Sequence, residues 1–141
     1  MIEHNFNLND FFLYTACVNV LVVGGGALGL WTLKLSQYLM GRDCSNVRVM
    51  VADNNIERLM VAQDHGCSDI IFWNEEDHEQ YIVERTLDAC RGGVDVIIDF
   101  VGSHRTMQRS LKVLNRVSIS LKLAFILPLS CCERIVGILF I

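Results

Sequence analysis

The sequence predicts an α/β fold with a doubly wound parallel sheet, and three features lead to this prediction. Short β-rich runs alternate with segments of helix length between residues 19 and 114. The runs are almost continuously apolar, as strands are when a parallel sheet is buried on both faces. A cluster of glycines separates the first run from the first helical segment. The order βαβαβαβα therefore indicates a single domain whose connecting helices cover both sides of one sheet.

Four strands are predicted before residue 101, at residues 19–23, 47–52, 69–72 and 94–100. Each contains valine or isoleucine, which favour strands. After residue 116, apolar and polar residues alternate up to Phe125, and this period of two permits a fifth strand. We expect the strand order 3-2-1-4-5, in which the first and fourth strands flank the crevice where the order reverses.

Two predicted helices, at residues 30–40 and 55–65, are each followed by a glycine. Glycine readily adopts the left-handed conformation that ends many helices. In the second helix, Ile56, Leu59 and Met60 are predicted to share the face that packs on the sheet.

Two further helices are predicted from their N-terminal caps. Asn74 precedes three acidic residues, 75–77, which would occupy the first helical turn, and Ser103 precedes the fourth helix. The predicted inner faces are Val83, Leu87 and Cys90 in the third helix and Met107, Leu111 and Leu114 in the fourth.

Composition and charge narrow the function classes. The 141 residues are 52% hydrophobic and 20% charged, which suits one domain with a substantial core. The net charge of −4 argues against a nucleic-acid binder and against a polybasic membrane-surface protein. Charged residues interrupt the apolar C-terminal run, so no membrane span is predicted. The 6 cysteines lack zinc-ligand spacing, and free thiols in a cytoplasmic protein are expected.

The glycine cluster carries the clearest functional signal. Gly24, Gly26 and Gly29 form the pattern Gly-x-Gly-x-x-Gly, with Ala27 and Leu28 between the last two. Gly24 permits a tight turn, Gly26 lets the backbone approach a pyrophosphate, and Gly29 lets the helix pack closely on the sheet. Free N–H groups at the helix start would then bind phosphates. Between a strand and a helix, this pattern predicts a Rossmann-type dinucleotide site.

Asp53 is the second part of the predicted cofactor site. It ends the second strand, where a carboxylate can accept hydrogen bonds from ribose hydroxyls and repel a 2′-phosphate. This favours NAD over NADP as cofactor. Arg58, one helical turn further on, either flanks the ribose or adenine or is a solvated surface charge.

The end of the fourth strand is the third part of the predicted cofactor site. Val101 and Gly102 follow this strand, and in a doubly wound sheet the ligand lies at the carboxyl ends of the strands flanking the crevice. Both residues are therefore candidates to line the cofactor site. Asp99, within the strand, is expected to be structural.

Four stretches, at 20–30, 51–59, 64–69 and 93–102, resemble the cofactor domain of the medium-chain dehydrogenases/reductases. The likeness is strongest to the zinc-dependent alcohol and polyol dehydrogenases. It implies hydride transfer between NAD and a secondary alcohol or polyol in the parent family. It also implies NAD(H) binding by Gly24, Gly26, Ala27, Leu28, Gly29, Asp53 and Arg58.

The resemblance covers about residues 17–116, which we expect to form the NAD-binding domain. Residues 1–16 are an extension that matches nothing in the family. Residues 117–141 are an atypical hydrophobic tail that would supply the fifth strand and, from residue 135, a sixth. The sheet is expected to be incomplete at its C-terminal edge.

The family's catalytic domain supplies its zinc ligands and proton relay, and nothing in this chain resembles that domain. We therefore expect no catalytic residue and no zinc ligand here, and an alcohol substrate only where a catalytic domain is supplied. The alternative function is a catalytically inactive nucleotide-binding module or truncated fragment. The flank that the catalytic domain would cover favours self-association into a homo-oligomer.

Overall fold

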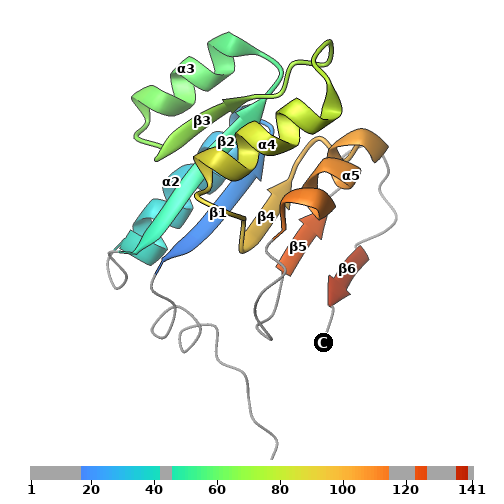
Figure 1. Cartoon of the computed structure of the whole chain (residues 1–141). Coiled ribbons are helices and arrows are strands. Elements are labelled where there is room, and N and C mark those ends of the chain that lie inside the picture. The colour runs from blue at the N-terminus through green and yellow to red at the C-terminus, as the bar shows by residue number, and fades with distance from the viewer. Residues whose placement is uncertain (1–16, 42–45, 115–122, 127–135, 140–141) are drawn as a thin grey trace, which may run out of the picture.

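A sheet with the strand order β3-β2-β1-β4-β5-β6 forms the centre of the computed structural model (Figure 1). The structure describes residues 17–41, 46–114, 123–126 and 136–139. Neighbouring strands from β3 to β5 are parallel, and β6 pairs antiparallel with β5. The predicted α/β class and the order 3-2-1-4-5 are confirmed.

The strands are β1 Val18–Val23, β2 Val47–Asp53, β3 Asp69–Phe72, β4 Val96–Asp99, β5 Leu123–Ile126 and β6 Val136–Leu139. The helices are α2 Ala27–Gly41, α3 Ile56–Asp64, α4 Glu79–Ala89 and α5 His104–Val113. The first predicted helix begins earlier than expected, at Ala27, so the last three residues of the glycine pattern already belong to α2. The fourth strand is shorter than predicted, because Val94 forms only an isolated bridge with Leu114.

The core has two layers, one on each face of the central strand β1. Leu21 packs with residues of α4 and α5, such as Ile82 and Val113. Val22 packs on the other face with Leu33 of α2 and residues of α3. The helices therefore cover both faces of the sheet, as the continuously apolar strands predict.

Two predicted helix faces are only partly correct. In α3, Leu59 and Ala62 are buried, whereas Ile56 and Met60 are 59% and 53% exposed. This short helix meets the sheet along a narrow stripe, so its other apolar side chains stay in solvent. In α5 the buried residues are Thr106, Arg109, Ser110 and Val113. Of the predicted residues, Leu114 packs against the core. Leu111 is 61% exposed, because polar partners rather than hydrophobicity orient this helix.

The predicted start of the third helix is also wrong. The helix α4 begins at Glu79, after an N-cap residue, His78, that makes no side-chain capping bond. Asn74 instead accepts a hydrogen bond from the backbone of Glu76 at 3.2 Å, which forms a local turn. Residues 75–77 therefore lie in a loop after β3. Cys90, the C-cap residue of α4, is buried as predicted, and Val83 and Leu87 pack against the core.

Residues 1–16 and most of 117–141 lie outside the described residues, so the predicted domain boundaries stay predictions. The strands β5 and β6 come from that last segment. In the described part of the chain, no helix combines the length and apolarity needed to cross a membrane.

Candidate functional site

The glycine turn joins β1 to α2 at the carboxyl edge of the sheet. Gly24 has a φ of +102°, a left-handed conformation that glycine adopts without strain. A Cβ added to Gly29 would lie 1.8 Å from the carbonyl oxygen of Gly24, so no side chain fits there. A Cβ on Gly26 would meet nothing within 4 Å. The turn is thus tightly packed beneath α2 and open at Gly26.

A hollow of about 240 Å³ lies over this turn. It is lined by Gly24, Gly26, Ala27, Leu28, Gly29, Arg58, Phe100 and Val101. All five residues of the glycine pattern that were predicted to bind the cofactor are among them. The first residues of α2 contribute unpaired backbone N–H groups and the positive end of the helix dipole, which suit an anion.

Asp53 connects the glycine turn to the start of α3. Its side chain is only 3% exposed. One carboxylate oxygen, Oδ2, accepts a hydrogen bond from the backbone of Gly25 at 2.6 Å. The other, Oδ1, accepts from the backbone of Asn55 at 2.8 Å. The carboxylate is therefore held rigidly beside the turn, and each oxygen keeps a lone pair for a further donor.

Arg58 projects from α3 towards the same carboxylate. Its Nη1 lies 3.8 Å from Oδ2 of Asp53, and its side chain is 58% exposed. It lines both the hollow over the glycine turn and a second cavity beside it. The structure thus places Arg58 at the junction of the two spaces, where a contact with a ligand is geometrically open.

Asp99 organises the loop after β4. Its Oδ1 accepts hydrogen bonds from the backbones of Val101 at 2.8 Å and Gly102 at 3.0 Å. Its Oδ2 accepts from the hydroxyl of Thr106 at 2.6 Å. The carboxylate is buried and fully engaged, which agrees with the structural role expected of it. Val101 lines both spaces, whereas Gly102 shapes the loop with a φ of +63° and lines neither.

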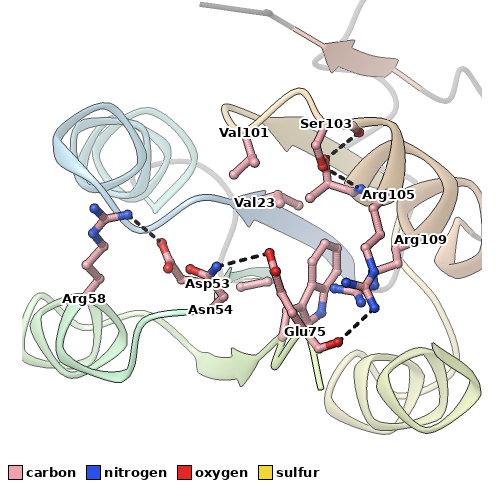
Figure 2. A pocket seen from close by; sticks show the side chains of 12 residues that line it. Val23, Asp53, Asn54, Arg58, Glu75, Val101, Ser103, Arg105 and Arg109 are labelled. Carbon is pink, nitrogen blue, oxygen red and sulfur yellow. Dashed lines mark hydrogen bonds and ion pairs between the residues drawn. The ribbon is translucent and has the colours of Figure 1, made fainter. Parts of the chain in front are cut away.

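The second cavity has a volume of about 220 Å³ and lies at the carboxyl ends of the strands (Figure 2). It is lined by Val23, Ala52, Asp53, Asn54, Arg58, Trp73, Glu75, Val101, Ser103, Arg105, Thr106 and Arg109. Figure 2 shows Asp53 and Arg58 on one side, Arg105 and Arg109 on the other, and Glu75 between them. Arg58 and Val101 line both this cavity and the hollow over the glycine turn. The two spaces therefore form one groove along the strand ends.

The far wall of this cavity is built by Arg109, whose side chain is 3% exposed. Its Nε donates to both carboxylate oxygens of Glu79 at 2.9 Å. Its guanidinium carbon lies 5.4 Å from the centre of the Trp73 ring, within range of a cation–π interaction. The Trp73 indole in turn donates to the hydroxyl of Thr86 at 3.0 Å. These contacts hold α4, α5 and the end of β3 together behind the groove.

Comparison with known protein families shows the family to which this chain belongs. The family model described as "Zinc-binding dehydrogenase" matches residues 27–117, more than half of the chain. The chain belongs to the zinc-binding dehydrogenase family. The resemblance to the medium-chain dehydrogenases/reductases is thereby confirmed.

Two relatives match this chain along part of their length. It is 34% identical over 97 residues to L-idonate 5-dehydrogenase of Vitis vinifera. It is 35% identical over 95 residues to sorbitol dehydrogenase of Arabidopsis thaliana. Each match covers 66% of this chain and 24% of the relative. The chain thus spans about a quarter of the length of these curated relatives.

One solved structure with a similar fold is quinone oxidoreductase of Escherichia coli, complexed with NADPH. The identity is 26% and the TM-score is 0.56. The match covers 70% of this chain and 28% of the other. The Rossmann-type α/β architecture of this chain is therefore that of its family.

Sequence reasoning missed Glu75, Arg105 and Arg109 in this family member. Glu75 carries a usable signal, because it follows β3 and the carboxyl ends of parallel strands meet at one edge. In α5, Arg105 and Arg109 are four residues apart and so share a face. The prediction considered only the apolar residues of that helix and made no assignment for the two arginines.

The zinc that gives the family its name has no binding site in the part of this chain that the structure describes. There, no three side chains of histidine, cysteine, aspartate or glutamate come together as a metal site would require. The described residues do not fit a zinc ion, and we assign zinc no role in them.

Proposed function

We propose that this chain binds NAD(H) as the cofactor-binding part of an alcohol or polyol dehydrogenase-like oxidoreductase. In the proposed activity, hydride passes between NAD and a secondary alcohol. The observation that carries the proposal is the 2.6 Å hydrogen bond from the backbone of Gly25 to Asp53. This bond fixes a buried carboxylate beside a glycine turn, which is the pairing that ribose and diphosphate recognition requires.

Each part of the groove then has a role in holding the dinucleotide. Backbone N–H groups at the start of α2 would bind the diphosphate over the open position at Gly26. Asp53 would accept hydrogen bonds from the adenosine ribose. The adenine would enter the cavity on the far side of Asp53, since Arg58 and Val101 line both spaces. When bound, the nicotinamide supplies the hydride chemistry.

The proposed preference for NAD over NADP rests on charge. A 2′-phosphate would approach the Asp53 carboxylate, whose oxygens face the ribose position. Among the described residues, Arg58 is the one cation paired with this carboxylate, and its guanidinium is already 3.8 Å away. The like charges would repel, so the 2′-hydroxyl of NAD is the better fit.

A thermal melt of the full chain tests both statements, with no ligand, with NAD and with NADP. A ligand at about 100 times its dissociation constant stabilises the folded state by about 2.7 kcal/mol. We expect NAD to raise the melting temperature by several degrees and NADP to raise it less. Equal shifts would refute the NAD preference, and the absence of any shift would refute cofactor binding.

We also propose a cytoplasmic location. Among the described residues, Cys17, Cys67 and Cys90 are free thiols, as is usual in a reducing compartment. Cell fractionation followed by immunodetection tests this, and recovery of the chain from an oxidising compartment would refute it.

A further inference from the structure

Equal numbers of positive and negative side chains surround the cavity beside Asp53. Three arginines, 58, 105 and 109, line it together with Asp53 and Glu75. Glu79 adds a third carboxylate, at 2.9 Å from Arg109 and 3.8 Å from Arg105. Three positive and three negative groups leave no net charge. The cavity therefore suits a neutral polar group better than an additional phosphate.

Arg109, which lines this cavity, has an unsatisfied donor. Its Nε is paired with Glu79, but its Nη2 is buried and has no hydrogen-bond partner among the described residues. A buried charged donor without an acceptor destabilises a protein, and native structures rarely keep one without a reason. An acceptor atom on a ligand in the cavity would satisfy it after a small rotation of the guanidinium.

The size and walls of the cavity indicate which part of a ligand enters it. Its volume of about 220 Å³ is smaller than the roughly 300–1,000 Å³ of pockets that hold whole small molecules. Val23, Ala52 and Val101 give it apolar surface, and Val101 is 55% exposed. A flat heteroaromatic ring with polar edge atoms fits this combination.

Glu75 supplies the complementary acceptor. Its backbone carbonyl accepts a hydrogen bond from Nη2 of Arg105 at 2.9 Å, which anchors the loop after β3 to α5. Its carboxylate lies 3.5 Å from Nδ2 of Asn54, at the limit of a hydrogen bond. An ionised carboxylate can only accept, so Glu75 favours a donor on the ligand.

We propose that Arg109 and Glu75 read the edge of the adenine base of the cofactor. Arg109 donates to a ring nitrogen, and Glu75 accepts from the 6-amino group. The inference rests on the proposed NAD binding and adds to it a selection among purine bases. Hypoxanthine carries an oxygen in place of the amino group, so the same position would set an acceptor against the Glu75 carboxylate.

Isothermal titration of the full chain with NAD and with nicotinamide hypoxanthine dinucleotide tests the proposal. The two ligands share their riboses, diphosphate and nicotinamide and differ only in the purine. We expect the hypoxanthine compound to bind about tenfold more weakly or worse, as loss of a hydrogen bond to a charged group implies. If both ligands bind equally, the base reading is refuted while NAD binding stands. If neither binds, the proposed function fails and this inference fails with it.

Glu75→Gln isolates the reading residue. The amide can donate to the hypoxanthine oxygen, so the ratio of the two affinities should fall towards one. Glu76→Gln removes the same charge from the next residue, which does not line the cavity, and should keep the wild-type ratio. A ratio that stays unchanged in Glu75→Gln, or changes equally in both variants, would refute the role of Glu75.

Arg109→Met tests the donor. Methionine preserves much of the packing on Trp73 and removes every N–H group, so NAD affinity should fall about tenfold. A melt without ligand establishes first that the variant folds, and Arg109→Leu, which also lacks side-chain N–H groups, serves if it does not. Wild-type NAD affinity in a folded variant would refute the role of Arg109.

Discussion

At the scale of single residues, the groove depends on atoms whose positions leave little freedom. Gly29 is close enough to the carbonyl of Gly24 that no Cβ fits between them. Asp53 uses both carboxylate oxygens to join the turn to α3. Gly29 therefore sets how closely α2 approaches β1, and Asp53 sets where α3 begins.

Gly29→Ala should destabilise the fold. The new Cβ would overlap the Gly24 oxygen, and such overpacking costs about 1–3 kcal/mol, or several degrees in melting temperature. Gly26→Ala is the matched control, because a Cβ there meets nothing within 4 Å. It should leave the melting temperature unchanged and weaken NAD binding. Equal melting temperatures for the two variants would contradict the assignment of Gly29 to helix packing.

Asp53→Asn should weaken NAD binding about tenfold, because hydrogen bonds from the ribose to a charged acceptor are lost. It should also reduce the preference for NAD over NADP, because the charge that repels a 2′-phosphate is gone. Titration with both cofactors measures this ratio, which does not depend on fold stability. Asp64→Asn, at the exposed end of α3, is the control. A preference unchanged in Asp53→Asn would place the ribose elsewhere.

At the scale of elements, polar contacts orient the helices behind the groove. The hydroxyl of Thr86 accepts from the Trp73 indole at 3.0 Å and donates to the carbonyl of Ile82 at 2.7 Å. Arg109 joins α5 to α4 through Glu79. These contacts explain why α5 buries Arg109 instead of the apolar Leu111.

Thr86→Val should lower the melting temperature by several degrees. Valine keeps the shape of threonine but leaves the buried Trp73 N–H without an acceptor, which costs about 1–3 kcal/mol. Thr86→Ser retains the hydroxyl and should lose less stability. Thermal melts followed by tryptophan fluorescence compare the two. If the serine variant were the less stable, packing of the methyl group would outweigh the hydrogen bond.

At the scale of the whole molecule, buried thiols give the fold a dependence on alkaline pH. Burial raises the pKa of the Cys90 thiol from 9.0 to about 12. Burial also raises the pKa of Cys67, with the Asp69 carboxylate adding to the effect. In the unfolded chain Cys90 loses its proton near pH 9, whereas in the folded chain it stays protonated to about pH 12. The contribution of this thiol to stability is therefore fully present below pH 9 and is lost between pH 9 and pH 12.

The melting temperature should accordingly fall between about pH 8 and about pH 10, and fall less in Cys90→Ala. The alanine variant has no thiol to ionise in its unfolded state, so part of the pH dependence disappears with the side chain. Cys17→Ala, at an exposed cysteine, should keep the full decrease. Identical pH dependence in the wild type and Cys90→Ala would refute the linkage.

The sequence by itself determined the alternation of strands and helices, the strand order and the glycine turn. These follow from local rules, namely the apolar runs, the Gly-x-Gly-x-x-Gly spacing and the position of Asp53 at a strand end. Only the tertiary structure decided that Glu75 and Arg109 border one cavity. The two residues lie on different elements and meet because Arg105 binds the loop after β3 and Glu79 draws Arg109 inward. Hydrophobic periodicity cannot anticipate a helix face selected by ion pairs between distant segments, since those pairs exist only after the chain has folded.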